Sequence, residues 1–335
     1  MTKAVLVQQN CNRELLDRVY NKDSMEKASK YAEFYPEIIN RENLQQHKEY
    51  LINTEIIFST WGMTDFTEEE LQQYFPRLKA VFYGAGSVQA FARPFLNRGI
   101  TVVSAWAANA VPVAEYTLAQ ILLANKGYYQ NVLKAKTDYE AARRYSGSFP
   151  GNYNTNVGIL GAGMIGKMVV ELLKPFRLNV LVFDPFLPEE SALRLGVRKC
   201  SLTEIFSQCH TISNHIANLP QTVGLINKEH FNIMLPEATF INTGRGAQVV
   251  EEDMIEALKA EPSRTALLDV TNPEPPAEGS ELYKLPNVFL TTHIAGSFGS
   301  EIQRMGCYMA DEFEAYSSGR ELKFAVTLKM LETMA

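Results

Sequence analysis

The sequence lacks several features that would assign it to a specialised class of protein. Its 335 residues include four cysteines with no C-x-x-C spacing and no pairing with histidines, so they predict neither a metal site nor a disulfide framework. Acidic residues outnumber basic ones by 38 to 32, and the net charge of -6 is not typical of a nucleic-acid-binding protein. No apolar run approaches the roughly 20 residues that a membrane span requires, so we expect no membrane partner.

The N-terminus also lacks a targeting signal. The first ten residues, MTKAVLVQQN, contain no apolar h-region of a signal peptide, and together with the unpaired cysteines this predicts a cytoplasmic protein. An apolar content of 46% and a charged content of 21% are close to globular averages. The length predicts about two domains, each able to bury a core of its own.

What the sequence does contain is a glycine-rich pattern in the segment Asn156–Asp184, NVGILGAGMIGKMVVELLKPFRLNVLVFD. The apolar run Val157–Leu160 predicts a buried strand, and Gly161, Gly163 and Gly166 follow it at G-x-G-x-x-G spacing. Apolar residues at helical spacing come next. A strand, three spaced glycines and a helix in this order predict a dinucleotide-binding site.

Each part of this pattern has a physical role. Gly161 allows a tight turn, Gly163 lets the backbone approach a pyrophosphate, and Gly166 lets the helix pack closely on its strand. A second predicted strand, Val180–Phe183, leads to Asp184, which lies 18 residues after the last glycine. A carboxylate there accepts hydrogen bonds from a ribose diol and repels a 2′-phosphate, so the predicted cofactor is NAD and not NADP.

The rest of the chain alternates strand-like and helical segments, and this alternation is typical of parallel sheets. Before the glycine pattern, the predicted strands are Ala4–Val7, Glu55–Ser59, Ala80–Tyr83 and Thr101–Val103, and the predicted helices include Glu68–Tyr74 and Val113–Asn125. After it, the predicted strands are Thr211–Asn214, Thr239–Asn242, Ala266–Val270 and Val288–Thr291. A capping box at Ser201 and Glu204 predicts the start of a helix, and a last helix is predicted over Glu301–Tyr316.

We therefore expect an α/β fold with two Rossmann-like domains, in which the cofactor domain is inserted into a discontinuous substrate domain. Residues 1–107 and 299–335 are expected to form the flavodoxin-like substrate domain, and residues 108–298 the NAD-binding domain. The segment Tyr128–Tyr153, rich in Tyr, Arg, Lys and Gly, is typical either of an arm that reaches a second subunit or of a plain surface excursion.

Three polar residues follow successive predicted strands of the second domain, where ligands bind in open parallel sheets. Arg245 lies between two glycines, Glu274 lies in a proline-rich loop, and His293 directly follows the strand VFLTT. Singly, each would be an ordinary surface or strand-end residue. Together they suit the reduction of a ketone, because a histidine can donate a proton, a carboxylate can stabilise its charged form, and a guanidinium can bind an oxo acid.

At these positions the sequence resembles the D-isomer-specific 2-hydroxyacid dehydrogenase family, over nearly the whole chain. The resemblance implies an NAD-dependent oxidoreductase that transfers a hydride between NAD(H) and C2 of a small 2-oxo or 2-hydroxy acid. It implies that Arg245 binds the substrate and that His293 is the acid/base, assisted by Glu274. The matching stretches are GAG at 84–86, NAVPVAE at 109–115, VGILGAGMIG at 157–166, INTGRGAQVVEE at 241–252, LDVTNPEP at 268–275 and THIAG at 292–296.

The same resemblance adds further candidate residues and a homodimeric state. Substrate binding is expected from the backbone amides of the glycine loop Gly84, Ala85, Gly86 and Ser87. Trp61 is expected either to form a wall of the substrate pocket or to pack in the core. Cofactor binding is expected, beyond the three glycines and Asp184, from Met164, Ile165, His215, Thr243 and Asp269. No metal is expected.

The chain also departs from the family pattern. Thr292, Ala217 and Val88 stand where the family often has proline, proline and aspartate, and these changes bear on substrate selection. The competing hypothesis is an NAD-sensing regulatory protein of the corepressor type, with little or no turnover. Turnover of a 2-oxo acid with NADH distinguishes the two functions.

Overall fold

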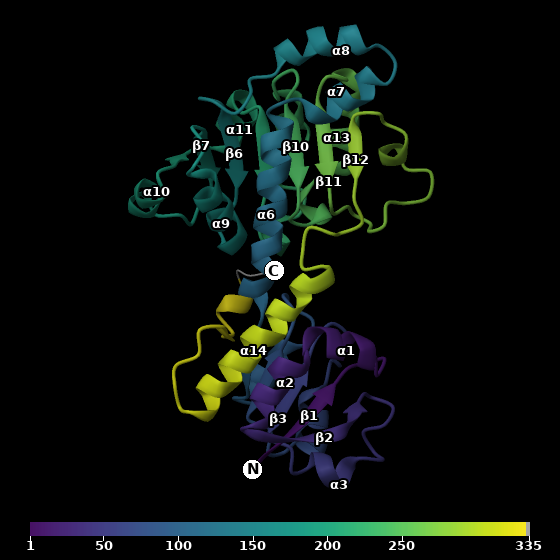
Figure 1. Ribbon diagram of the computed structural model, residues 1–335, viewed down its shortest axis with the longest axis vertical. Coiled ribbons are helices and arrows are strands. Elements are labelled where there is room, and N and C mark those ends of the chain that lie inside the picture. The colour runs from purple at the N-terminus through teal and green to yellow at the C-terminus, as the bar shows by residue number, and fades with distance from the viewer. Residues whose placement is uncertain (333–335) are drawn as a thin grey trace. The chain divides into compact units, whose positions relative to one another are not determined.

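The computed structural model describes residues 1–332, and the chain divides into two compact units (Figure 1). Unit 1 comprises Met1–Ala110 and the chain from Ser297 onward, and unit 2 comprises Val111–Gly296. The chain passes from one unit to the other within the helix α6 (Trp106–Ala124), after Ala110. The boundaries expected from the sequence, after residue 107 and before residue 299, differ from these unit boundaries by three and two residues. The functional roles of the two units stay predictions.

Unit 1 is built on a six-stranded sheet with the order β13-β5-β4-β3-β1-β2. All pairs are parallel except β13 with β5, which is antiparallel. The strand β13 was not predicted from the sequence. The edge strand β2 was also missed, because AEFYPEII contains a proline and charged residues that a central strand avoids. The strands are β1 (Thr2–Val7), β2 (Ala32–Ile39), β3 (Ile56–Ser59), β4 (Ala80–Tyr83), β5 (Thr101–Ser104) and β13 (Ala325–Val326).

Helices cover both faces of this sheet. Successive residues of a strand point to opposite faces, so Val5 and Val7 join one buried cluster and Ala4 and Leu6 another. The first cluster includes residues of α4 and α5, and the second includes residues of α1, α2 and α14. The helices are α1 (Arg13–Val19), α2 (Lys22–Ser29), α3 (Lys48–Leu51), α4 (Glu68–Tyr74), α5 (Ala92–Asn97) and α14 (Ile302–Ser317).

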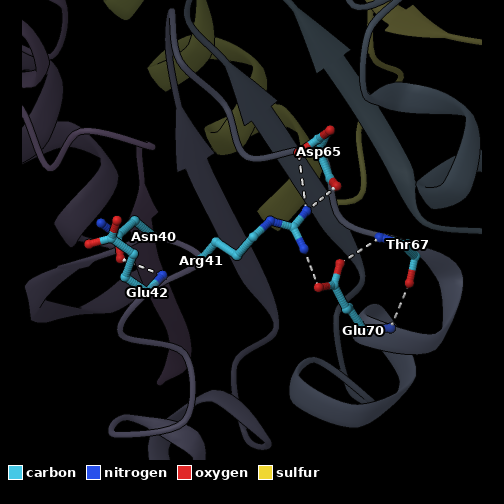
Figure 2. Close-up of polar contacts among 6 residues, drawn as sticks. All are labelled: Asn40, Arg41, Glu42, Asp65, Thr67 and Glu70. Carbon is cyan, nitrogen blue, oxygen red and sulfur yellow. Dashed lines mark hydrogen bonds and ion pairs between the residues drawn. The ribbon is translucent and has the colours of Figure 1, made fainter.

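A polar cluster fastens the segment after β2 to the start of α4 (Figure 2). The Arg41 guanidinium contacts the Glu70 carboxylate and lies 3.1 Å from the Asp65 carboxylate. Glu70 also closes a capping box with Thr67 at the N-terminus of α4. Exposed ion pairs contribute at most about 1 kcal/mol each, so this cluster orients the surface chain more than it stabilises the unit.

Unit 2 is built on a seven-stranded sheet with the order β12-β11-β10-β9-β6-β7-β8, and every pair is parallel. The predicted α/β fold with two Rossmann-like sheets is therefore confirmed. The strands are β6 (Asn156–Leu160), β7 (Asn179–Phe183), β8 (Arg198–Lys199), β9 (Thr211–Asn214), β10 (Thr239–Asn242), β11 (Thr265–Leu268) and β12 (Val288–Leu290).

The helices of unit 2 lie on both faces of its sheet (Figure 1). One buried cluster joins residues of α6, α9 and α10 to the sheet, and the other joins residues of α11, α12 and α13. The predicted capping box of Ser201 and Glu204 is present at the start of α11. In residues 1–332, no helix is long and apolar enough to cross a membrane. The remaining helices are α7 (Tyr128–Ala135), α8 (Tyr139–Tyr145), α9 (Met164–Leu173), α10 (Glu189–Leu195), α11 (Leu202–Gln208), α12 (Lys228–Asn232) and α13 (Glu251–Ala260).

Candidate active site

The carboxyl ends of six strands of unit 2 lie in one row. The parallel registers align the last residues of β7, β6, β9, β10 and β11 with one another, and β12 ends on the same row. The residue that follows each strand therefore leaves the sheet at the same edge. These residues are Asp184, Gly161, His215, Thr243, Asp269 and Thr291, and five of the six are residues that the sequence predicted to be functional.

The glycine loop begins at this edge, and two of its glycines are required by the protein itself. Gly161 has a φ of +90°, and a Cβ there would lie 2.7 Å from the backbone oxygen of His215. A Cβ on Gly166 would lie 2.0 Å from the backbone oxygen of Gly161, so only glycine lets α9 pack this closely.

Gly163 differs from the other two glycines, because a Cβ on it would meet no atom within 4 Å. It is the N-cap of α9, and no side chain caps the helix there. The first amides of α9 and the open space beside Gly163 thus fit a pyrophosphate, which binds well at a helix N-terminus. The side chain of Met164, the first residue of α9, is 39% exposed.

Asp184 is already hydrogen-bonded to the backbone around it. One carboxylate oxygen accepts from the amide of Ala162 at 2.7 Å, and the other accepts from the amide of Phe186 at 2.8 Å. These bonds fix the carboxylate next to the glycine loop. Because an ionised carboxylate offers about four acceptor sites, both oxygens retain capacity for the two hydroxyls of a ribose.

His293 and Glu274 form a direct pair. Nδ1 of His293 lies 2.7 Å from Oε1 of Glu274, and the two side chains are 46% and 42% exposed. A carboxylate that accepts from Nδ1 fixes the orientation and the tautomer of the ring. The other ring nitrogen, Nε2, is left for a ligand.

The turn that presents His293 is held by Asp269. His293 has a φ of +59°, a conformation that costs a non-glycine residue about 1–2 kcal/mol, and its amide donates to the backbone oxygen of Asp269 at 3.1 Å. The buried Asp269 carboxylate accepts from Oγ1 of Thr291 at 2.6 Å and from the amides of Ile294 and Ala295 at 2.8 and 2.9 Å. Strained conformations persist where surrounding bonds over-determine them, and these bonds lie on both sides of the histidine.

Arg245 follows β10 and is partly buried. Its Nη1 donates to the backbone oxygen of Gly244 at 2.8 Å. Burial lowers the pKa of Arg245, and the nearby negative charge of Glu274 opposes this shift. Glu274 therefore interacts with both Arg245 and His293. The next residue, Gly246, is required sterically, because a Cβ there would lie 2.0 Å from the backbone of Thr271.

His215 is not suited to proton transfer. Its ring nitrogens lie 3.0 Å from Oγ of Ser213 and 3.4 Å from Oγ1 of Thr243. Burial lowers the pKa of His215 to about 3, so the ring is neutral at physiological pH. Thr243 is itself buried and also lies 3.3 Å from the hydroxyl of Thr117. Both residues belong to the strand-end row, and their role in cofactor binding stays a prediction.

The glycine loop predicted for substrate binding, Gly84–Ser87, follows β4 in unit 1. The amide of Gly84 already donates to the backbone oxygen of Ser59 at 2.7 Å, so it is engaged within the protein. Oγ of Ser104 donates to the backbone oxygens of Ala85 and Gly86, and these bonds fix the loop. Val88, at the position where the family often has aspartate, is fully buried. Trp61, in the turn after β3, is 37% exposed and is not a core residue.

Sequence reasoning missed several residues that shape this site. Thr291 was predicted only as the end of a strand, yet it bonds to Asp269. Asn214 and Asn242 are the last residues of β9 (TISN) and β10 (TFIN) and are buried. A buried polar residue at the last position of two neighbouring strands was the available signal. Among residues 1–332, no group of acidic, histidine or cysteine side chains is arranged to bind a metal ion.

The fold and the strand-end row have the arrangement of a dinucleotide-binding α/β protein. Comparison with known proteins assigns the family. Residues 120–295 match the model described as D-isomer specific 2-hydroxyacid dehydrogenase, NAD binding domain. The chain belongs to this family, and its cofactor is NAD.

Individual relatives agree with this assignment. The chain is 31% identical to D-3-phosphoglycerate dehydrogenase of Archaeoglobus fulgidus over 70% of its length and 44% of the relative. It is also 31% identical to the protein of that name from Methanocaldococcus jannaschii, over 67% of its length and 42% of the relative. The chain thus spans less than half the length of these curated relatives.

Solved structures support the fold. A phosphoglycerate oxidoreductase from Rhizobium etli superposes with a TM-score of 0.78 at 20% identity, over 97% of this chain and 98% of that one. D-mandelate dehydrogenase from Rhodotorula graminis gives a TM-score of 0.77, also at 20% identity and with the same coverage. At these identities the likeness concerns the fold alone.

Proposed function

We propose that the protein is an NAD-dependent dehydrogenase of a small D-2-hydroxy acid, acting on the CH-OH group at C2. The observation that carries the proposal is the His293–Glu274 pair, 2.7 Å apart, next to Arg245 on the strand-end row that also holds the glycine loop. A proton donor, a fixed cation and a dinucleotide cradle on one sheet edge are the groups that reduction of a 2-oxo acid requires. The bound NADH would supply the hydride.

The cofactor would be held by the glycine loop and by Asp184. The amides at the N-terminus of α9 receive the pyrophosphate, and the open side of Gly163 allows its close approach. Asp184 accepts the ribose hydroxyls with its remaining lone pairs and repels a 2′-phosphate, so we expect NAD to be preferred over NADP. Met164, Ile165, His215, Thr243 and Asp269 complete the proposed cofactor residues.

His293 would act as the acid/base. With Nδ1 held by Glu274, Nε2 donates a proton to the substrate carbonyl oxygen during reduction and accepts it during oxidation. The carboxylate of Glu274 would hold the ring in one orientation in both directions of the reaction. The bonds of Asp269 to the turn keep the ring in one place between these steps.

Arg245 would bind the 2-oxo acid. Its guanidinium stays charged and can hold a carboxylate through two parallel hydrogen bonds while it polarises the carbonyl. For unit 1, taken by itself, the family resemblance implies substrate binding by the backbone amides of Ala85, Gly86 and Ser87, with Gly84 shaping the loop, and by Trp61. A homodimer and a cytoplasmic location also stay proposals.

The test is an NADH-oxidation screen of the purified chain with glyoxylate, pyruvate, hydroxypyruvate, 2-oxoglutarate and bulkier oxo acids. D-3-phosphoglycerate is assayed in the oxidising direction, because the two relatives are named for it. We expect turnover with at least one oxo acid and faster turnover with NADH than with NADPH. A protein that binds NADH but turns over none of these acids would instead be a regulatory NAD-binding protein.

A further inference from the structure

Three buried amide side chains meet beneath Arg245, at the ends of β9 and β10. Asn214 and Asn242 are the last residues of these strands, and Gln248 ends the short 3-10 turn that follows Arg245. Their exposed fractions are 0%, 1% and 0%. The sequence analysis assigned them no role, and their bonds to Arg245 are to its backbone atoms.

The three amides bond to one another. Nδ2 of Asn214 donates to Oδ1 of Asn242 at 3.0 Å and to Oε1 of Gln248 at 2.6 Å. Oδ1 of Asn214 accepts from the amide of Ile216 at 3.2 Å, and Nε2 of Gln248 donates to the backbone oxygen of Ile216. The trio is therefore anchored to the loop that follows β9.

The same amides hold the Arg245 backbone on both sides. Oε1 of Gln248 accepts from the amide of Arg245 at 3.2 Å, and Nδ2 of Asn242 donates to its backbone oxygen at 3.2 Å. Oδ1 of Asn242 also accepts from the amide of Gly244 at 3.1 Å. The direction in which Arg245 leaves the sheet is thus set by side-chain hydrogen bonds, because regular strand pairing ends at residue 242.

Stability alone gives little reason for such a trio. A fully bonded polar network in a core contributes little more than apolar side chains of the same shape would, whereas a half-bonded one is costly. What a directional network adds is a single backbone conformation. We propose that Gln248, together with Asn214 and Asn242, is a positioning residue that acts on the substrate through Arg245.

This inference rests on the proposed function, in which Arg245 binds the 2-oxo acid. Gln248→Met removes the acceptor for the Arg245 amide while keeping a similar side-chain length. A displacement of about 1 Å in a binding group can reduce catalysis by about 100-fold. We expect the KM for the oxo acid to rise by at least about tenfold, while the Kd for NADH changes by less than about twofold.

The test is a double-mutant cycle of Gln248→Met with Arg245→Lys, read out as the KM for the oxo acid and the Kd for NADH. If Gln248 acts through Arg245, its substitution adds little to the effect of Arg245→Lys, because coupled residues are not additive. Full additivity, or an unchanged KM in Gln248→Met, would overturn the proposal. If Arg245→Lys itself leaves the KM unchanged, the proposed function of Arg245 is wrong instead.

Two further variants separate positioning from stability. Asn287 is a buried amide at the opposite edge of the sheet, where it donates to the backbone oxygens of Leu258 and Arg264. Asn287→Leu should lower the melting temperature without changing the KM. Asn214→Leu combined with Gln248→Leu also removes the bond from the amide of Ile216, so we expect a melting temperature no higher than for Gln248→Met and a KM that stays raised. A KM that follows the melting temperature across all these variants, Asn287→Leu included, would show a purely structural role.

Discussion

Replacing Gly163 by alanine tests the proposed cofactor site at a position where the protein itself leaves room. A Cβ on Gly163 meets no atom within 4 Å, whereas a Cβ on Gly166 lies 2.0 Å from the backbone oxygen of Gly161. The two substitutions add the same methyl group three residues apart. They therefore separate contact with the ligand from contact within the protein.

The expected sizes of the two effects follow from these distances. In Gly166→Ala, α9 must move away from its strand, and overpacking of this kind costs about 3 kcal/mol, or roughly 6–12 °C in the melting temperature of a unit of this size. In Gly163→Ala, the φ of -70° is allowed for alanine, so the free energy of unfolding should change by less than about 1 kcal/mol. The methyl group would instead collide with the pyrophosphate and raise the Kd for NADH by roughly 5- to 150-fold.

Thermal unfolding and NADH fluorescence titration measure the two quantities on the same samples. Gly163→Ala should combine a normal melting temperature with weak NADH binding, and Gly166→Ala should lower the melting temperature. An unchanged NADH affinity in Gly163→Ala would refute the placement of the pyrophosphate beside this residue. An unchanged melting temperature in Gly166→Ala would show that the close packing of α9 is not needed.

The remaining predictions concern the strand-end row. His293→Gln should abolish turnover while NADH still binds, and retained turnover would remove His293 from its role. Asp184→Ala should narrow the preference for NADH over NADPH in kcat/KM, and an unchanged preference would argue against the ribose contact. Thr291→Val removes one hydrogen bond to Asp269, so it should lower kcat about tenfold and the free energy of unfolding by about 1–3 kcal/mol. A kcat equal to that of the wild type would contradict the proposed role of this bond. Because the pKa of His215 is about 3 when folded and near 6.5 when unfolded, the unfolded chain binds the extra proton in this window. The free energy of unfolding should therefore fall as the pH drops below 6.5, and it should fall less steeply in His215→Asn than in the wild type. Equal dependence on pH in the two proteins would contradict a buried neutral ring at His215.

Local sequence patterns predicted most of the strands and helices of the fold. The predicted strands of both sheets are present, and most of them bury apolar residues within the sheet. The helix of the glycine pattern, α9, ends at Leu173, before Pro175. The strands that were missed, β2, β8 and β13, lie at the edges of their sheets, and β2 carries proline and charged residues. Edge strands are half paired, so their sequences need not be apolar throughout.

For the site, the sequence by itself determined which residue types follow which strands. Gly161 has a positive φ, Gly166 lies against the backbone of Gly161, and Arg245, Glu274 and His293 each come after a predicted strand. Such features depend on neighbours within a few residues. Pattern alone is therefore enough to predict them.

Only the tertiary structure decided which of these residues meet. The register of the parallel strands places residues far apart in sequence on one edge, and it brings Nδ1 of His293 to the carboxylate of Glu274. It also directs Asp269 to the turn around His293 and gathers three amides beneath Arg245. These contacts depend on how strands align when both faces of the sheet are buried, which no short stretch of sequence encodes.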